Sequence, residues 1–134
     1  MSGLSAGGKW RAKAAKPEAQ VICLHGDGSF GQNAMELDTT VRHKLPLLCV
    51  ISLNGGWTAD PEHNKPGRDL GYTRYDKMAE ALGCYAEYVE EPEQIGPALD
   101  RAWKKVEEGM VGFVNVKTDY RPRATTVRFS SRET

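Results

Sequence analysis

The chain has 134 residues, and its 18 Lys and Arg balance 18 Asp and Glu, so its formal net charge at pH 7 is zero. This balance provides no global attraction for nucleic acid or an anionic membrane surface, and no apolar run is long enough to span a bilayer. The first twenty residues lack the apolar middle of a signal peptide, so we expect a cytoplasmic protein. Cys23, Cys49 and Cys84 show no C-x-x-C spacing, which favours reduced, buried thiols.

Short apolar runs alternate with helical patterns along the chain. The expected helices cover residues 4–16, 31–44, 72–83 and 91–109, and the expected strands cover 20–25, 45–53, 84–90 and 110–118. The run at 20–25 is almost continuously apolar, which predicts a strand that is buried on both faces. Strands that alternate with helices predict an α/β fold, a three-layer domain with a parallel sheet flanked by helices.

We expect this domain to cover residues 1–118 and to be followed by a basic tail, 119–134. The tail carries four arginines, Arg121, Arg123, Arg128 and Arg132. Two interpretations of the tail stay open, a solvated end or a lid near an anionic substrate.

The strand expected at 20–25 runs directly into Gly26-Asp27-Gly28-Ser29. Glycines allow the backbone to approach a ligand closely, and free N–H groups at the start of a following helix attract anions such as phosphate. Asp27 supplies a carboxylate, the kind of ligand that Mg²⁺ prefers. The alternative for these residues alone is a plain turn in which Asp27 caps the helix.

The next expected strand ends in "SLNGGW", where Asn54 offers an amide oxygen and Gly55 and Gly56 offer main-chain carbonyls. If the two strands are parallel neighbours, Asn54 lies beside Asp27 at the edge of the sheet where α/β proteins bind ligands. Mg²⁺ takes about six oxygen ligands and seldom takes all of them from protein. The pattern therefore predicts a Mg²⁺ site that water and diphosphate oxygens complete.

Together, "GDGSF" and "LNGGW", one helix and one strand apart, resemble the diphosphate-binding motif of thiamine-diphosphate-dependent enzymes. The chain looks most similar to the acetolactate synthase, oxalyl-CoA decarboxylase and 2-hydroxyacyl-CoA lyase group. The resemblance implies the thiamine-diphosphate-binding fold, with thiamine diphosphate and Mg²⁺ as cofactors. It implies that Asp27 and Asn54 bind the metal through their side chains and Gly56 through its carbonyl. The implied cofactor-binding residues are Gly26, Asp27, Gly28, Ser29, Asn54 and Gly56.

Two features depart from the family pattern. Leu53 replaces the first asparagine of the N-N motif, although the second is the usual ligand, so the metal site is retained. The chain is also too short for the second domain, which in this family carries the activating glutamate. We therefore assign no catalytic residue here and expect a pyrimidine-binding domain or large subunit as partner, in a hetero-oligomer. The chain is then either a natural small subunit or a piece of a longer enzyme.

The resemblance implies that the complete enzyme makes or breaks a carbon–carbon bond next to a carbonyl. We expect a 2-hydroxyacyl-CoA lyase-like reaction, in which a 2-hydroxyacyl-CoA splits into an aldehyde or ketone and formyl-CoA. The alternative is an acetolactate synthase-like enzyme or a 2-oxoacid decarboxylase component. A different class also stays open, a non-catalytic cofactor-binding or assembly module. The expected substrate is a small acyl-CoA or 2-oxoacid, and neither nucleic acid nor membrane is an expected partner.

The loop expected at 54–71 holds two more candidates beyond the metal motif. Trp57 is expected to pack under this loop, and a substrate platform is the alternative. His63 is expected to be an ordinary loop histidine, and the alternative is that it approaches a substrate.

Overall fold

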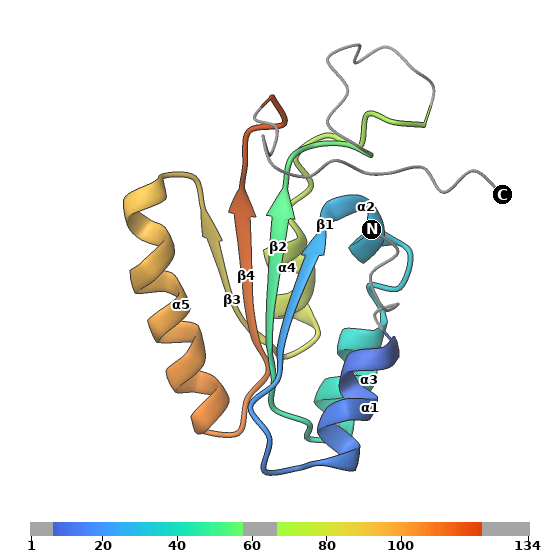
Figure 1. The fold of residues 1–134 in the computed structure, drawn as a ribbon, viewed down its shortest axis with the longest axis vertical. Coiled ribbons are helices and arrows are strands. Elements are labelled where there is room, and N and C mark those ends of the chain that lie inside the picture. Colours follow the sequence, from blue (N-terminus) through green and yellow to red (C-terminus); the bar gives the residue numbers. More distant parts are fainter. Residues whose placement is uncertain (1–6, 58–66, 122–134) are drawn as a thin grey trace, which may run out of the picture.

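Parallel strands in the order β1-β2-β4-β3 form the sheet of this computed structural model, which describes residues 7–57 and 67–121 (Figure 1). The strands are β1 (Ile22–Gly26), β2 (Leu48–Leu53), β3 (Tyr85–Val89) and β4 (Gly112–Lys117). The helices are α1 (Gly7–Ala15), α2 (Asp27–Gly31), α3 (Glu36–Arg42), α4 (Tyr75–Ala81) and α5 (Pro92–Glu107). All three pairings between neighbouring strands are parallel, as predicted.

The sheet is the middle of three layers. Helices α1, α3 and α4 lie on one face, and α5 lies on the other (Figure 1). The first face buries Phe30, Ile51 and Phe113, and the rings of Phe30 and Phe113 are 5.4 Å apart at their centroids. On the second face, Ala98 and Ala102 of α5 pack against the sheet. The predicted three-layer α/β fold is confirmed.

The helix expected at 31–44 is interrupted in the structure. A short helix, α2, already begins at Asp27, and α3 begins only at Glu36. Between them, tight turns close through hydrogen bonds from the N–H of Asn33 to the carbonyl of Phe30 and from the N–H of Glu36 to the carbonyl of Asn33. The prediction of one continuous helix over 31–44 was wrong, because these turns separate α2 from α3.

Helix ends elsewhere follow their sequence signals. Helix α5 begins with a capping box between Glu91 and Gln94 and has proline in its first turn. Gly83 after α4 and Gly109 after α5 have φ values of 93° and 91°, the left-handed conformation that glycine supplies at helix ends.

The prediction that β1 is buried on both faces is wrong for this chain. Cys23 and His25 are buried, whereas Ile22 and Leu24 on the opposite face are 62% and 69% exposed. The reason is that α5 packs mainly on β3 and β4, so the described residues leave the α5-side face of β1 open.

The three cysteines are free, buried thiols, as predicted. Burial raises the pKa of the Cys84 thiol to about 12. Across residues 7–57 and 67–121, no helix has the length and apolar character needed to cross a bilayer.

Candidate cofactor site

Strands β1 and β2 end side by side, because Gly26 is in register with Ser52. The segments that follow them meet at this edge. The Oδ2 atom of Asp27 accepts a 2.7 Å hydrogen bond from the N–H of Gly55, and its Oδ1 accepts a 2.8 Å bond from the N–H of Gly28. The structure thus brings both halves of the predicted motif together.

The Asp27 carboxylate lies in a sheltered position, with the residue only 1% exposed. Burial raises the pKa of Asp27 above its ordinary value, and hydrogen bonds from backbone N–H groups, including those of Gly28 and Gly55, act in the opposite direction. A buried carboxylate that is ionised is stabilised by a nearby cation. Each carboxylate oxygen has two lone pairs, so an oxygen that accepts one backbone bond can also bind a metal.

Asn54 and Ser29 contribute further side-chain oxygens at this edge. Asn54 accepts a 3.2 Å hydrogen bond on Oδ1 from the N–H of Gly56, so its amide oxygen points back toward the turn. The hydroxyl of Ser29 donates to the carbonyl of Gly26 at 3.0 Å. Carboxylate, amide and main-chain carbonyl oxygens are hard ligands, which suit Mg²⁺. The donor chemistry therefore fits the predicted metal, and the assignment of Asp27, Asn54 and Gly56 as its ligands stays a prediction.

Glycine is required at three positions of the motif, Gly28, Gly55 and Gly56, and a Cβ atom on Gly56 would stand 2.7 Å from the carbonyl oxygen of Arg68. A Cβ atom on Gly28 would stand 2.7 Å from Cδ2 of Trp57, because the indole packs directly on the backbone of α2. Gly55 has a φ of 82°, which residues with a side chain rarely adopt, and a Cβ atom there would stand 3.4 Å from Cζ of Tyr72. These glycines let backbone, indole and phenol rings meet at the end of the sheet.

Trp57 packs against Gly28 of α2 and is 37% exposed, and its place under the 54–71 loop stays a prediction because residues 58–66 lie outside the described residues. The chain after it returns toward the site, since the N–H of Trp57 donates to the carbonyl of Arg68 at 2.9 Å. The N–H of Leu70 donates to the carbonyl of Gly55, also at 2.9 Å. His63 lies outside the described residues.

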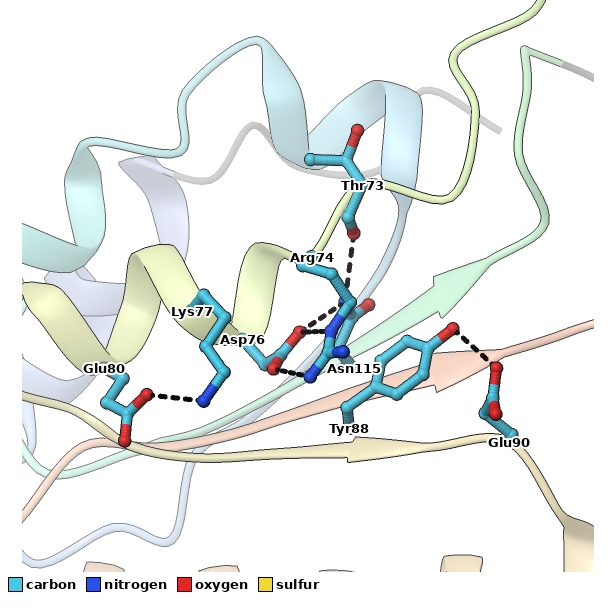
Figure 2. Close-up of polar contacts among 8 residues, drawn as sticks. All are labelled: Thr73, Arg74, Asp76, Lys77, Glu80, Tyr88, Glu90 and Asn115. Atoms are coloured by element: carbon cyan, nitrogen blue, oxygen red, sulfur yellow. Dashed lines mark hydrogen bonds and ion pairs between the residues drawn. The ribbon is translucent and has the colours of Figure 1, made fainter.

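A partly buried polar network beside this loop was not predicted from the sequence (Figure 2). Arg74 binds Asp76 through two hydrogen bonds, Nε to Oδ1 at 2.8 Å and Nη2 to Oδ2 at 2.7 Å. Asn115 of β4 donates from Nδ2 to the carbonyl of Thr73 at 3.2 Å and to Oδ1 of Asp76 at 3.4 Å. An asparagine inside the apolar run "MVGFVNVKT" was the one signal that could have indicated it.

This network fixes the segment by which the loop rejoins the fold. Burial raises the pKa of Asp76, but hydrogen bonds from Arg74 and Asn115 and the charge of Arg74 outweigh it, so the pKa is lowered overall. The guanidinium of Arg74 also lies 4.1 Å from the centroid of the Tyr88 ring. The network also binds the carbonyl of Thr73, the residue directly after Tyr72.

The tail expected to be basic begins next to this edge. Arg121 forms a 2.6 Å ion pair with Asp119, and both line a groove with Tyr72 and Lys117. The charge of Arg121 is therefore matched locally by a carboxylate. Arg123, Arg128 and Arg132 lie outside the described residues, and the division into a domain at 1–118 and a tail at 119–134 stays a prediction.

Parallel strand ends with a buried carboxylate and adjoining glycine turns define a ligand-binding α/β domain. Residues 3–116 match the family model described as "Thiamine pyrophosphate enzyme, C-terminal TPP binding domain". The chain therefore belongs to the thiamine pyrophosphate enzyme family, which confirms the family predicted from its motifs.

Individual relatives include two kinds of enzyme. The chain is 42% identical over 118 residues to "Acetolactate synthase large subunit IlvG" of Mycobacterium tuberculosis (strain ATCC 25618 / H37Rv), covering 81% of this chain and 20% of that protein. It is 34% identical over 136 residues to "2-hydroxyacyl-CoA lyase 2" of Homo sapiens, covering 93% of this chain and 22% of that protein. It thus spans about a fifth of the length of these relatives.

A solved structure supports the fold. The "Rhodococcus jostii RHA1 thiamine diphosphate-dependent 4-hydroxybenzoylformate decarboxylase" superposes with a TM-score of 0.71 at 24% sequence identity, over 86% of this chain and 23% of that chain. At this identity the likeness concerns the fold alone.

Proposed function

We propose that this chain is the Mg²⁺- and diphosphate-binding part of a thiamine-diphosphate-dependent lyase or carboligase. The observation that supports it best is the contact between the Asp27 carboxylate and the N–H of Gly55, which joins both halves of the motif at one sheet edge. Asp27 and Asn54 would hold the metal with the carbonyl of Gly56, while Gly26, Gly28 and Ser29 line the diphosphate. When bound, the thiazolium of the cofactor stores the electron pair released at a carbonyl carbon.

The part played by this chain is binding and orientation. The metal ligands anchor the diphosphate at the strand ends, and the glycines let the backbone approach it closely. The rings of Trp57 and Tyr72 lie beside Gly28 and Gly55 at this edge, where they would flank the bound diphosphate. The proton-transferring glutamate belongs, in this proposal, to a pyrimidine-binding domain or large subunit of the same enzyme.

We place the reaction first with 2-hydroxyacyl-CoA lyases, whose products would be an aldehyde or ketone and formyl-CoA. The supporting observation is the similarity to 2-hydroxyacyl-CoA lyase 2, which extends over 93% of the chain. An acetolactate synthase-like reaction on a 2-oxoacid is the second candidate, favoured by the higher identity of 42% over a shorter span.

Mg²⁺-dependent binding of thiamine diphosphate tests the cofactor site. We expect addition of cofactor and Mg²⁺ to shift the amide NMR signals of Gly28, Gly55 and Gly56, and chelation of Mg²⁺ to reverse the shifts. Asp27→Ala and Asn54→Ala should remove the Mg²⁺-dependent shifts, whereas Asp38→Ala on the surface of α3 should keep them. Thiamine without its diphosphate serves as the ligand control. Unchanged Mg²⁺-dependent binding by either site variant would disprove the ligand assignment.

Turnover tests the need for a partner. The purified chain should convert neither 2-hydroxyacyl-CoA nor pyruvate when both cofactors are added. In this proposal the glutamate that transfers the proton lies on the partner domain. Combination with the partner domain should restore one of the two reactions, which then identifies the substrate class. Turnover by the chain alone contradicts the partner requirement, and cofactor binding without any turnover in the complex favours a non-catalytic module.

A further inference from the structure

A fully buried asparagine stands in the middle of β4. Asn115 is 0% exposed, although its neighbours in the strand, Val114 and Val116, are apolar. Its Oδ1 has no hydrogen-bond partner among the described residues, whereas its Nδ2 donates to the carbonyl of Thr73 and to Asp76. A buried polar atom without a partner costs stability, so an apolar residue would serve the strand itself better. The contacts of Nδ2 therefore indicate the role of this side chain.

The turn at the end of β2, residues 54–57, is bonded to the chain that returns from the loop. We call residues 68–73 the return segment. The N–H of Trp57 donates to the carbonyl of Arg68, and the N–H of Leu70 donates to the carbonyl of Gly55, both at 2.9 Å. The position of the turn therefore depends on where the return segment is held.

The far end of the return segment is anchored to β4. The carbonyl of Thr73 accepts a 3.2 Å bond from Nδ2 of Asn115 and a 2.9 Å bond from the N–H of Tyr75, the first residue of α4. Asp76, the second contact of Asn115, is itself bound by the two nitrogens of Arg74 (Figure 2). Asn115 thus attaches the corner between the return segment and α4 to the middle of the sheet.

Lys117, two residues further along β4, contacts the return segment at a second point. Side chains at positions i and i+2 of a strand share a face, so Lys117 projects to the same side of the sheet as Asn115. Its Nζ lies 5.2 Å from the centroid of the Tyr72 ring and forms a 3.1 Å ion pair with Glu90. A cation over an aromatic ring attracts the ring. The same ring lies beside Gly55, where a Cβ atom would stand 3.4 Å from its Cζ.

We propose that Asn115 and Lys117 are positioning residues of the cofactor site, which act through the return segment on the turn at Gly55. Held at Tyr72 and Thr73, the return segment keeps the N–H of Gly55 on the Asp27 carboxylate, at 2.7 Å. Loss of either contact lets the turn move, so the affinity for Mg²⁺ and diphosphate falls while the sheet stays intact. The proposal rests on the proposed function, in which Asp27 binds the metal.

Hydrogen exchange in the free chain tests the positioning without any cofactor. Asn115→Val replaces the amide by an apolar side chain that suits a strand, and Lys117→Met removes the exposed charge. We expect exchange at the amides of Gly55 and Leu70 to speed up about tenfold in Asn115→Val and about threefold in Lys117→Met, through loss of a hydrogen bond and of a cation–π contact. Lys105→Met is the matched control, since Lys105 is also paired with a glutamate but lies on α5.

Titration with thiamine diphosphate and Mg²⁺ tests the effect on the cofactor site. We expect the dissociation constant to rise about tenfold for Asn115→Val and about threefold for Lys117→Met, and to stay at the wild-type value for Lys105→Met. Lys117→Arg should keep the wild-type affinity, because it retains a cation for the ring of Tyr72 and the carboxylate of Glu90. The thermal midpoint of each variant separates this effect from a general loss of stability.

The outcomes separate positioning from a purely structural role. Faster exchange at Gly55 together with weaker binding, at a thermal midpoint close to that of wild type, supports the proposal. Unchanged exchange at Gly55 overturns it, and so does a lower thermal midpoint with uniformly faster exchange across the sheet. If Asn115→Val does not fold, Lys117→Met and its rescue by Lys117→Arg decide by the same criteria. Absence of Mg²⁺-dependent binding by the wild-type chain disproves the proposed function, while the exchange rates still decide the positioning.

Discussion

The Asp27 carboxylate, one residue past β1, accepts a 2.7 Å hydrogen bond from the N–H of Gly55, two residues past β2. This contact ties together two turns that are 28 residues apart in the sequence. The buried Asp27 carboxylate thereby gains a backbone hydrogen-bond donor, and the N–H of Gly55 carries no charge that would neutralise it. In the proposed function, a metal ion would offset the remaining cost of this buried charge.

The raised pKa of Asp27 predicts a pH dependence of stability with a defined sign. Since the folded pKa lies above the ordinary 3.8, Asp27 favours folding most when protonated, and this contribution is lost as pH rises through the folded pKa. Relative to wild type, Asp27→Asn should therefore gain unfolding free energy as pH rises through that range. Urea unfolding of both proteins between about pH 3.5 and pH 7 measures the difference. A difference that stays constant over this range contradicts the raised pKa.

The packing of Trp57 on Gly28 predicts a local cost for any side chain at position 28. Gly28→Ala would place a Cβ 2.7 Å from the indole, so the ring must move, and we expect a loss of about 1–3 kcal/mol in unfolding free energy. Gly26→Ala is the control, because a Cβ there meets nothing within 4 Å. In a Trp57→Ala background the cost should vanish, and an undiminished cost in that background would disprove the contact.

The burial of the three cysteines predicts low thiol reactivity in the folded state. Cys84 is 5% exposed and burial raises its pKa to about 12, so the reactive thiolate is scarce at neutral pH. We expect an aromatic disulfide reagent to label no cysteine quickly in the native chain and all three after unfolding. Rapid labelling of any one of them under native conditions contradicts the burial described here.

Much of the fold and of the site's location could be predicted because both depend on local patterns. The apolar runs specify the strands, and parallel pairing places Asp27 and Asn54 at one edge. The start of α2 at Asp27 could not be predicted, since Gly28 and Ser29 disfavour helix and the buried Phe30 ring supplies the stabilising contact.

Contacts between residues far apart in the chain could not be predicted from a single sequence. Asn115 stands out in its strand, but its contact Asp76 is 39 residues away, and nothing in either segment specifies the pairing. The open face of β1 was missed for a related reason. Its apolar pattern predicts burial on both faces, whereas α5 packs mainly on β3 and β4 and leaves Ile22 and Leu24 exposed.

The network around Asp76 gives a last prediction. Its lowered pKa means that Asp76 contributes stability above the ordinary 3.8 and loses that contribution as pH falls through the folded pKa. Asp76→Asn should cost about 1–2 kcal/mol near neutral pH, because hydrogen bonds to a charged group are weakened, and the difference from wild type should shrink on acidification. Glu80→Gln on the same helix is the control, since Glu80 is paired with Lys77 on the exposed surface (Figure 2) and such pairs contribute little. Denaturant unfolding at neutral and acidic pH measures both variants, and an equal effect of the two substitutions would show that Asp76 has no special role in the fold.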